Sequence, residues 1–471
     1  MSEVSEIKQC SKALLYRIVM IAAVGGFLFG YDMALISGAA LYLEKAWNLD
    51  PSAVGAINAS ALIGCPIGSF LGLWMADSWG RNKALIFSAF LFIISGAGCA
   101  LSNGSDYSLG VLHVMDFNFW RIIGGAGVGL ASTVSPMYIA EISPAQLRGR
   151  MVVINQLANV IGIVLSAMVS YWIAEAAKKA GIADGNWRMM FWTLIVPSVI
   201  LLIGLLTVPK SPRWLALKGQ DKEALDVLTL INGRERAEVE LKEIRQELGE
   251  EKGGWREMLQ PGVKKALWIG VILMVFSQIN GANMVLGYSP KIFVQAGITQ
   301  NETAIWNSIY VFAWITFTTI NSFWLTAKFG RRPILIWGIL GIALGNALMF
   351  LAFAFKLHWG VTLIAMFMSA GAATLTLFPL SWVILSEIFP NRVRGMAMSI
   401  ATIVMFVASY YTSKNFPVAA KASEEAYGHP GGVWMLFTLI DVVAIYFIWR
   451  HLPETKDKTL EEIGHSWLVK K

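Results

Sequence analysis

Two ionisable side chains lie at similar depth inside long apolar segments. Asp32 stands in GGFLFGYDMALISG, and Arg121 begins RIIGGAGVGLAS. An ionisable group inside a membrane raises the free energy of insertion by at least about 2.5 kcal/mol, so such residues are functional candidates. Each lies about six or seven residues from the midpoint of its segment, roughly 9 Å along a helix, and on the same side. The pair predicts a proton switch, because protonation of the acid would release the ion pair. The alternative is a purely structural pair.

A third ionisable residue, Asp441, lies near the middle of the apolar segment VWMLFTLIDVVAIYFIWR. No cation stands near it in the sequence, so it needs a partner or a proton. Asn346, also near the middle of an apolar segment, is a possible neighbour. We expect a neutral or hydrogen-bonded structural acid; a second proton-coupling site is the alternative.

Amides and an indole inside apolar segments could line a path for a hydroxylated substrate. Amides both donate and accept hydrogen bonds, and an indole can cover the face of a sugar ring. The alternative is that these side chains only join neighbouring helices. The candidates are Gln156, Asn159, Gln278, Asn280, Asn283 and Trp382.

Motifs of enzymes and metal sites do not occur in the sequence. It has no P-loop, no glycine pattern of a dinucleotide-binding fold and no cluster of histidines or cysteines. We therefore expect no catalytic residue, no metal site and no cofactor, and we expect that the protein is not an enzyme.

The elements that position these residues are predicted to be membrane helices. Of the 471 residues, 56% are hydrophobic and 15% are charged, and the mean hydropathy is +0.58. Such values indicate a protein of the lipid bilayer, and about 20 apolar residues are enough for one helical span. Twelve segments of this kind lie near residues 15–40, 53–76, 84–102, 117–139, 152–174, 188–208, 266–289, 304–327, 333–355, 361–386, 396–416 and 432–450.

The distribution of positive charge predicts the orientation of these helices. The net charge is +7, and many of the cations lie in short connections that share one side if the spans alternate. This pattern is typical of cytoplasmic loops, and it argues against a nucleic-acid partner. We expect a multi-pass protein of the inner (plasma) membrane with both termini in the cytoplasm, functional as a monomer.

An internal repeat divides the chain into two halves. EISPAQLRG at Glu141 recurs as EIFPNRVRG at Glu387, 246 residues later (387 − 141). Gly80-Arg81 recurs at Gly330-Arg331, 250 residues later (330 − 80), and PKSPRW recurs as PETKDK at an offset of 244 (453 − 209). Two six-helix halves with the same topology place a substrate path between them. The predicted domains are the bundles 1–208 and 266–452, a cytoplasmic linker with short amphipathic helices at 209–265, and a cytoplasmic tail at 453–471.

Several motifs together resemble the sugar porter family of the major facilitator superfamily over nearly the whole chain. They include GGFLFGYD, GLWMADSWGRNK, RIIGGAGVGLASTVSPMYIAEISPAQLRG, INQLANVIG, PKSPRWL, WVILSEIFPNRVRG and LPETKDKTLEEI. Bacterial proton-coupled monosaccharide symporters and facilitative glucose transporters share these patterns. The resemblance implies an all-α membrane protein of twelve helices in two pseudo-symmetric halves, which moves a monosaccharide or polyol by alternating access.

The resemblance also implies roles for single residues. Asp32 and Arg121 match the coupling pair of proton symporters. Positions that contact sugar in the family are Gln156, Ile163, Gln278, Asn283 and Trp382. Positions of the charge network that joins the halves on the cytoplasmic side are Asp77, Arg81, Glu141, Arg148, Arg213, Glu387 and Arg394.

The sequence departs from the family pattern at several of these places. Apolar or small residues replace sugar-binding side chains, and two acids of the cytoplasmic network are missing. The positions are Ser277, Gly287, Ile315, Met405, Phe406, Lys210 and Ala327. Each lost hydrogen bond is worth on the order of 0.5 to 1.5 kcal/mol, so a common hexose should bind weakly unless other groups compensate.

We therefore expect proton symport of a sugar or polyol. One alternative is a passive uniporter of the same fold, and another is a nutrient sensor that binds sugar without transporting it. A third alternative is a carrier of organic anions that uses Arg121.

Overall fold

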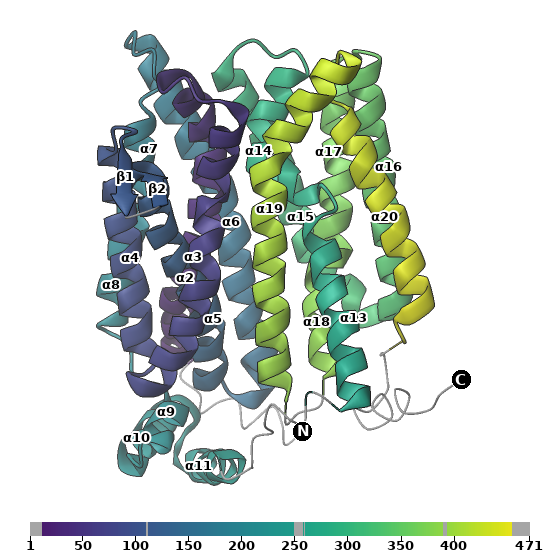
Figure 1. Cartoon of the computed structure of the whole chain (residues 1–471). Helices are drawn as coiled ribbons and strands as arrows, with labels where there is room; N and C mark the ends of the chain where they lie inside the picture. Colours follow the sequence, from purple (N-terminus) through teal and green to yellow (C-terminus); the bar gives the residue numbers. More distant parts are fainter. Residues whose placement is uncertain (1–11, 110–111, 249–257, 259, 390–392, 455–471) are drawn as a thin grey trace. The chain divides into compact units, whose positions relative to one another are not determined.

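The computed structural model describes residues 12–109, 112–248, 258, 260–389 and 393–454 (Figure 1). Helices make up most of this part of the chain, and eleven of them are long and apolar enough to cross a membrane. The remaining expected span, the eighth in chain order, is α15 (Asn301–Lys328), whose 28 residues are less apolar because of its threonines and asparagines. All twelve predicted segments are thus helical.

Most spans of the first half extend a few residues beyond the predicted segments, but the third and the sixth end at Leu101 and Leu205, before their predicted ends. The sixth span consists of two short helices. The bounds are α2 (Lys12–Ala46), α3 (Pro51–Ser78), α4 (Arg81–Leu101), α5 (Asp116–Ile142), α6 (Ala145–Lys179), α7 (Trp187–Thr193) and α8 (Ile195–Leu205).

The second half repeats this arrangement with two interrupted spans. The seventh span is broken between α13 and α14, where Gly281 has a φ of 81°, a value that favours glycine. The tenth span passes through a π-helical turn, η2. The bounds are α13 (Pro261–Gln278), α14 (Ala282–Gln295), α15 as above, α16 (Arg331–Ala354), α17 (Trp359–Ala372), η2 (Ala373–Leu377), α18 (Phe378–Ile388), α19 (Arg394–Tyr427) and α20 (Gly432–His451).

Glycines let the helices of the first half approach closely. A Cβ atom added to Gly68 would lie 1.9 Å from the carbonyl oxygen of Ala126, and one added to Gly129 would lie 1.9 Å from that of Cys65. These contacts join α3 to α5, and the absence of a side chain permits them. Gly30 brings α2 equally close to α6, since its added Cβ would lie 1.9 Å from the carbonyl oxygen of Asn159.

Two segments between the spans carry structure of their own. Residues Asp106–Leu109 (β1) and Leu112–Met115 (β2) pair as a short antiparallel hairpin, which the sequence analysis did not predict. The linker forms three short helices, α9 (Pro212–Leu217), α10 (Asp221–Asn232) and α11 (Arg234–Leu248). These helices lie at the end of α4 where that span begins, and the hairpin follows its other end (Figure 1).

The described chain forms two compact units that do not follow the halves of the sequence. Unit 1 comprises the described residues within 1–33, 63–166 and 188–251, and unit 2 comprises those within 34–62, 167–187 and 252–471. Unit 2 therefore contains one end of α2, α3 and α6 together with the helices of the second half. An ion pair of 2.7 Å between Lys291 and Glu44 joins α14 to α2 within it.

Candidate functional site

Asp32 and Arg121 form a buried ion pair in unit 1. The Nη1 atom of Arg121 on α5 lies 2.6 Å from Oδ1 of Asp32 on α2, and neither side chain is exposed. The structure thus brings together the two residues that the sequence placed at matched depth.

The ion pair is incompletely satisfied by hydrogen bonds. Oδ2 of Asp32 and the Nε and Nη2 atoms of Arg121 are buried without a hydrogen-bond partner. Removing two charges from water is unfavourable unless their other donors and acceptors are also satisfied. Protonation of the acid would leave the buried guanidinium without its counterion, and loss of one partner of a buried pair costs about 3 to 5 kcal/mol. Protonation of Asp32 would therefore favour an arrangement in which Arg121 is released from it.

Small residues place the acid next to α5. The added Cβ of Gly124 would lie 2.4 Å from Oγ of Ser95 and 4.0 Å from Oδ1 of Asp32. The added Cβ of Gly25 would lie 2.2 Å from Oγ of Ser135. Gly25 on α2 and Gly124 on α5 thus allow α2 to pack closely against α5. This close packing excludes water from the carboxylate of Asp32.

The predicted sugar-binding residues lie on both units. Gln156 is exposed and Ile163 is half-buried, two turns further along α6 in unit 1. Gln278 and Asn283 flank the break of the seventh span in unit 2, where Nδ2 of Asn283 donates to Oε1 of Gln278 at 2.7 Å. Trp382 on α18 of the same unit is 41% exposed. The structure brings Gln278 and Asn283 into contact.

A buried polar cluster contacts the backbone at the break of the seventh span. Nδ2 of Asn346 donates to Oδ2 of Asp441 at 2.9 Å and to the carbonyl oxygen of Asn280 at 2.8 Å. Oγ of Ser369 donates to Oδ1 of Asn346 at 2.9 Å. Asp441 therefore does contact Asn346, and its link to Asn280 was not predicted. These side chains are fully or almost fully buried, and Oδ1 of Asp441 has no hydrogen-bond partner.

Part of the predicted cytoplasmic charge network is assembled in unit 1. Arg81 lies 2.7 Å from Glu141 and 3.2 Å from Asp77. Ser211, which the sequence analysis did not single out, donates to Glu141 at 2.5 Å. Arg148 instead donates to the carbonyl oxygen of Ala140.

The corresponding pair recurs in unit 2. Arg331 lies 2.9 Å from Glu387, and these residues are the repeat equivalents of Arg81 and Glu141. The repeated motifs therefore form the same contact in each half. Arg213 is the second residue of α9 and Arg394 the first of α19. Among the described residues, no three His, Cys, Asp or Glu side chains gather as a metal site.

Comparisons with known proteins cover nearly the whole chain. A family model described as "Sugar (and other) transporter" matches residues 18–467. The chain is 38% identical to a D-xylose-proton symporter of Escherichia coli strain K12, over 98% of this chain and 97% of the relative. It is 36% identical to an arabinose-proton symporter of Bacillus subtilis, over 95% and 94% of the two chains.

A solved structure shares the same arrangement of helices. The inward open conformation of the xylose transporter XylE from E. coli matches 96% of this chain and 100% of its own, with a TM-score of 0.83 and 36% identity. The expected fold of twelve helices in two pseudo-symmetric halves is thereby confirmed.

Proposed function

We propose, on the premise that this chain belongs to the sugar transporter family of the major facilitator superfamily, that it moves a monosaccharide together with a proton by alternating access. The observation that carries the proton coupling is the buried ion pair between Asp32 and Arg121. Two relatives named above are proton symporters, one of xylose and one of arabinose. The protein is a transporter and not an enzyme.

The coupling step follows from the geometry of the pair. When Asp32 takes up a proton, it loses its charge and Arg121 loses its counterion. Arg121 then needs another acceptor, which favours a different packing of α2 against α5. Release of the proton restores the pair. A proton gradient can thus drive the exchange between two conformations.

The positions proposed for sugar binding carry fewer polar side chains than the family pattern. We assign Gln156, Ile163, Gln278, Asn283 and Trp382 to substrate binding. Ile315 is almost fully buried, and Phe406 is 9% exposed, at positions where the family offers polar or indole side chains. Fewer hydrogen-bond partners favour a sugar with fewer hydroxyl groups, so a pentose or a deoxy-sugar fits better than a hexose.

The halves 1–208 and 266–452 act as the two moving bundles, with residues 209–265 as their linker. Asp77, Arg81, Glu141, Arg148, Arg213, Glu387 and Arg394 form the cytoplasmic gate network. Both termini lie in the cytoplasm of a cell whose inner or plasma membrane holds the protein, which works as a monomer. The assembled Arg81–Glu141 and Arg331–Glu387 pairs support this gate.

Uptake into proteoliposomes tests the function directly. The panel comprises D-xylose, arabinose, glucose, inositol and deoxy-sugars, each with and without an imposed inward proton gradient. We expect that one or more pentoses or deoxy-sugars accumulate only with the gradient. Uptake that the gradient does not drive would indicate the passive uniporter. Binding without uptake would favour the sensor, and uptake of organic anions alone would favour the anion carrier.

The cluster around Asp441 is proposed to position the break of the seventh span. Asp441 holds Asn346, and Asn346 holds the carbonyl oxygen of Asn280, between Gln278 and Asn283 in the chain. The carboxyl group accepts its hydrogen bond from an amide and not from a cation, so a neutral acceptor satisfies this geometry. The role predicted here is that of a structural acid, and a second coupling site is its alternative.

Substitutions at Asp441 separate these two roles. Asp441→Leu removes the acceptor for Asn346 and should weaken sugar binding by about tenfold, which corresponds to 1 to 2 kcal/mol for a lost buried hydrogen bond. Asp441→Asn keeps an acceptor and should preserve both binding and proton-driven accumulation. Thr438→Val on the same helix is the control, because among the described residues its hydroxyl donates within α20, to the carbonyl oxygen of Trp434. Loss of accumulation in Asp441→Asn would instead assign coupling to Asp441.

A further inference from the structure

The first turn of α16 is capped by a carboxylate from a distant part of the chain. Oε1 of Glu454 accepts from the backbone N–H of Arg331 at 2.9 Å, and Oε2 accepts from that of Arg332 at 3.2 Å. The first N–H groups of a helix have no partner within the helix, and its N-terminus favours negative charge. In the second half, Glu454 meets both needs.

In the first half, the residue equivalent to Glu454 has the opposite charge. Arg81, at the start of α4, is the repeat equivalent of Arg331, and the offset of 244 residues makes Lys210 the equivalent of Glu454 (454 − 244). Gly80 at the N-cap position has no side chain with which to cap α4. The carboxylate that completes the repeat in one half is thus replaced by an ammonium group in the other.

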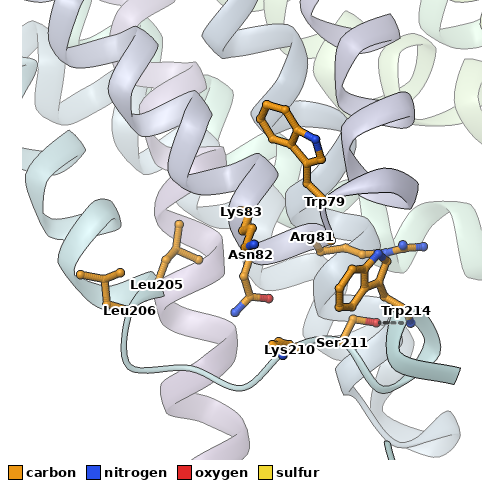
Figure 2. Close-up of a pocket in the computed structure, with 10 residues that line it drawn as sticks. Trp79, Arg81, Asn82, Lys83, Leu205, Leu206, Lys210, Ser211 and Trp214 are labelled. Atoms are coloured by element: carbon orange, nitrogen blue, oxygen red, sulfur yellow. Dashed lines mark hydrogen bonds between the residues drawn. The ribbon is translucent and has the colours of Figure 1, made fainter. Parts of the chain in front are cut away.

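A cavity lies at this place in unit 1, with a volume of about 250 Å³ (Figure 2). Its wall contains three cations and no acidic residue. Asn82 shapes the wall, because its Nδ2 donates to the carbonyl oxygens of Val208 and Pro209 and so holds the loop against α4. The lining residues are Trp79, Gly80, Arg81, Asn82, Lys83, Leu205, Leu206, Lys210, Ser211 and Trp214.

Two of the three cations remain available to a bound anion. Arg81 is engaged by Glu141 and Asp77. Lys83 is exposed and forms no ion pair within the described part of the chain. Lys210 lies 3.3 Å from Glu223, but both side chains are 53% exposed, and such surface pairs contribute about 0 to 1 kcal/mol. A better-placed anion can therefore compete for Lys210.

Exposed apolar side chains lie at the rim of the cavity. Leu206 at the end of α8 is 71% exposed and Trp79 at the end of α3 is 47% exposed. Tryptophans concentrate at the interface between membrane and water, and basic pockets at the ends of membrane helices bind anionic headgroups. The cavity thus lies where a lipid phosphate can reach it.

We propose that this cavity binds a phosphate-bearing anion, which takes the place of the missing carboxylate at the N-terminus of α4. Lys83 and Lys210 supply charge, and the backbone N–H groups of the first turn of α4 supply donors. Helix N-termini with nearby cations are established anion sites. The anion is the headgroup of an acidic phospholipid or free phosphate, and it strengthens the contact between α4 and the loop that leads into α9. This site is independent of the sugar carried.

Native mass spectrometry of the full-length protein in detergent tests the lipid source. We expect retention of phosphatidylglycerol over phosphatidylcholine with the same acyl chains. Lys83→Gln and Lys210→Glu should each lower that retention by about tenfold. Lys210→Glu supplies the carboxylate found in the other half and should abolish any effect of added anion on thermal stability. Lys218→Gln removes a charge from the same segment outside the cavity and is the matched control.

Thermal unfolding with inorganic phosphate, against chloride at equal ionic strength, tests the free ion. Protection of the unsubstituted protein by phosphate, lost in Lys83→Gln, would assign the site to free phosphate, whereas selective retention of phosphatidylglycerol would assign it to lipid. Both results support the proposal. It is overturned if phosphatidylglycerol retention in Lys83→Gln equals that of Lys218→Gln and phosphate protects no more than chloride. Lys83→Gln decides the matter even if Lys210→Glu does not fold.

Discussion

Asp32→Asn is expected to abolish accumulation of sugar against a gradient and to leave counterflow exchange intact. The substitution keeps the shape of the side chain and an oxygen that can accept from Arg121, but it removes the group that takes up a proton. Only the proton-driven step needs such a group. Exchange of internal for external sugar involves the loaded carrier alone and should stay within a few-fold of the unsubstituted rate.

Proteoliposomes loaded with or without sugar, under an imposed proton gradient, give both measurements on one preparation. Asp441→Asn is the matched control, because it makes the same chemical change at the other buried acid and should still accumulate sugar. If Asp32→Asn accumulates sugar as well as Asp441→Asn does, the pair is structural and the coupling site lies elsewhere. Loss of both exchange and accumulation would also contradict the prediction.

We expect Gly129→Ala to destabilise the fold more than a glycine-to-alanine substitution at the surface does. The added methyl group would lie 1.9 Å from the carbonyl oxygen of Cys65 and 2.8 Å from the backbone nitrogen of Ser69. Both atoms belong to the backbone of α3, so no side-chain rotation relieves the clash and the two helices must separate. Overpacking of this kind costs about 1 to 3 kcal/mol, and we expect the upper end of that range.

Thermal unfolding of the detergent-solubilised protein measures this effect. Gly149→Ala on α6 is the control, since Gly149 is exposed and its added Cβ meets nothing within 4 Å. Alanine favours a helix over glycine by up to about 1 kcal/mol, so the control should melt at the same or a higher temperature. Equal melting temperatures for the two variants would mean that α3 and α5 are not in close contact.

The sequence alone determined the helices, the repeat and the depth of the buried charges. The helices and the depths are local properties of the chain, and the repeat is found by comparing its segments. A long apolar segment must be helical in lipid, whatever surrounds it, because its backbone groups have no other partners there. Residue number along a helix then gives depth, which is why Asp32 and Arg121 could be placed at one level. The shared motifs added the expected roles of single residues.

The depth of a residue in the membrane does not determine the direction in which its side chain points from the helix axis. That direction depends on how neighbouring helices rotate and pack. The sequence could therefore suggest Asn346 as a neighbour of Asp441, but it did not reveal that Asn346 also holds the carbonyl oxygen of Asn280.

Tertiary packing also decides the roles of the two repeat-equivalent residues Glu454 and Lys210. Glu454 and Lys210 occupy equivalent places in sequence, and the departure at Lys210 was visible there. Only the folded chain shows that Glu454 caps the first turn of α16 and that a basic cavity lies at the matching turn of α4. This cap joins residues 123 positions apart, so it depends on packing and not on the local pattern of the chain.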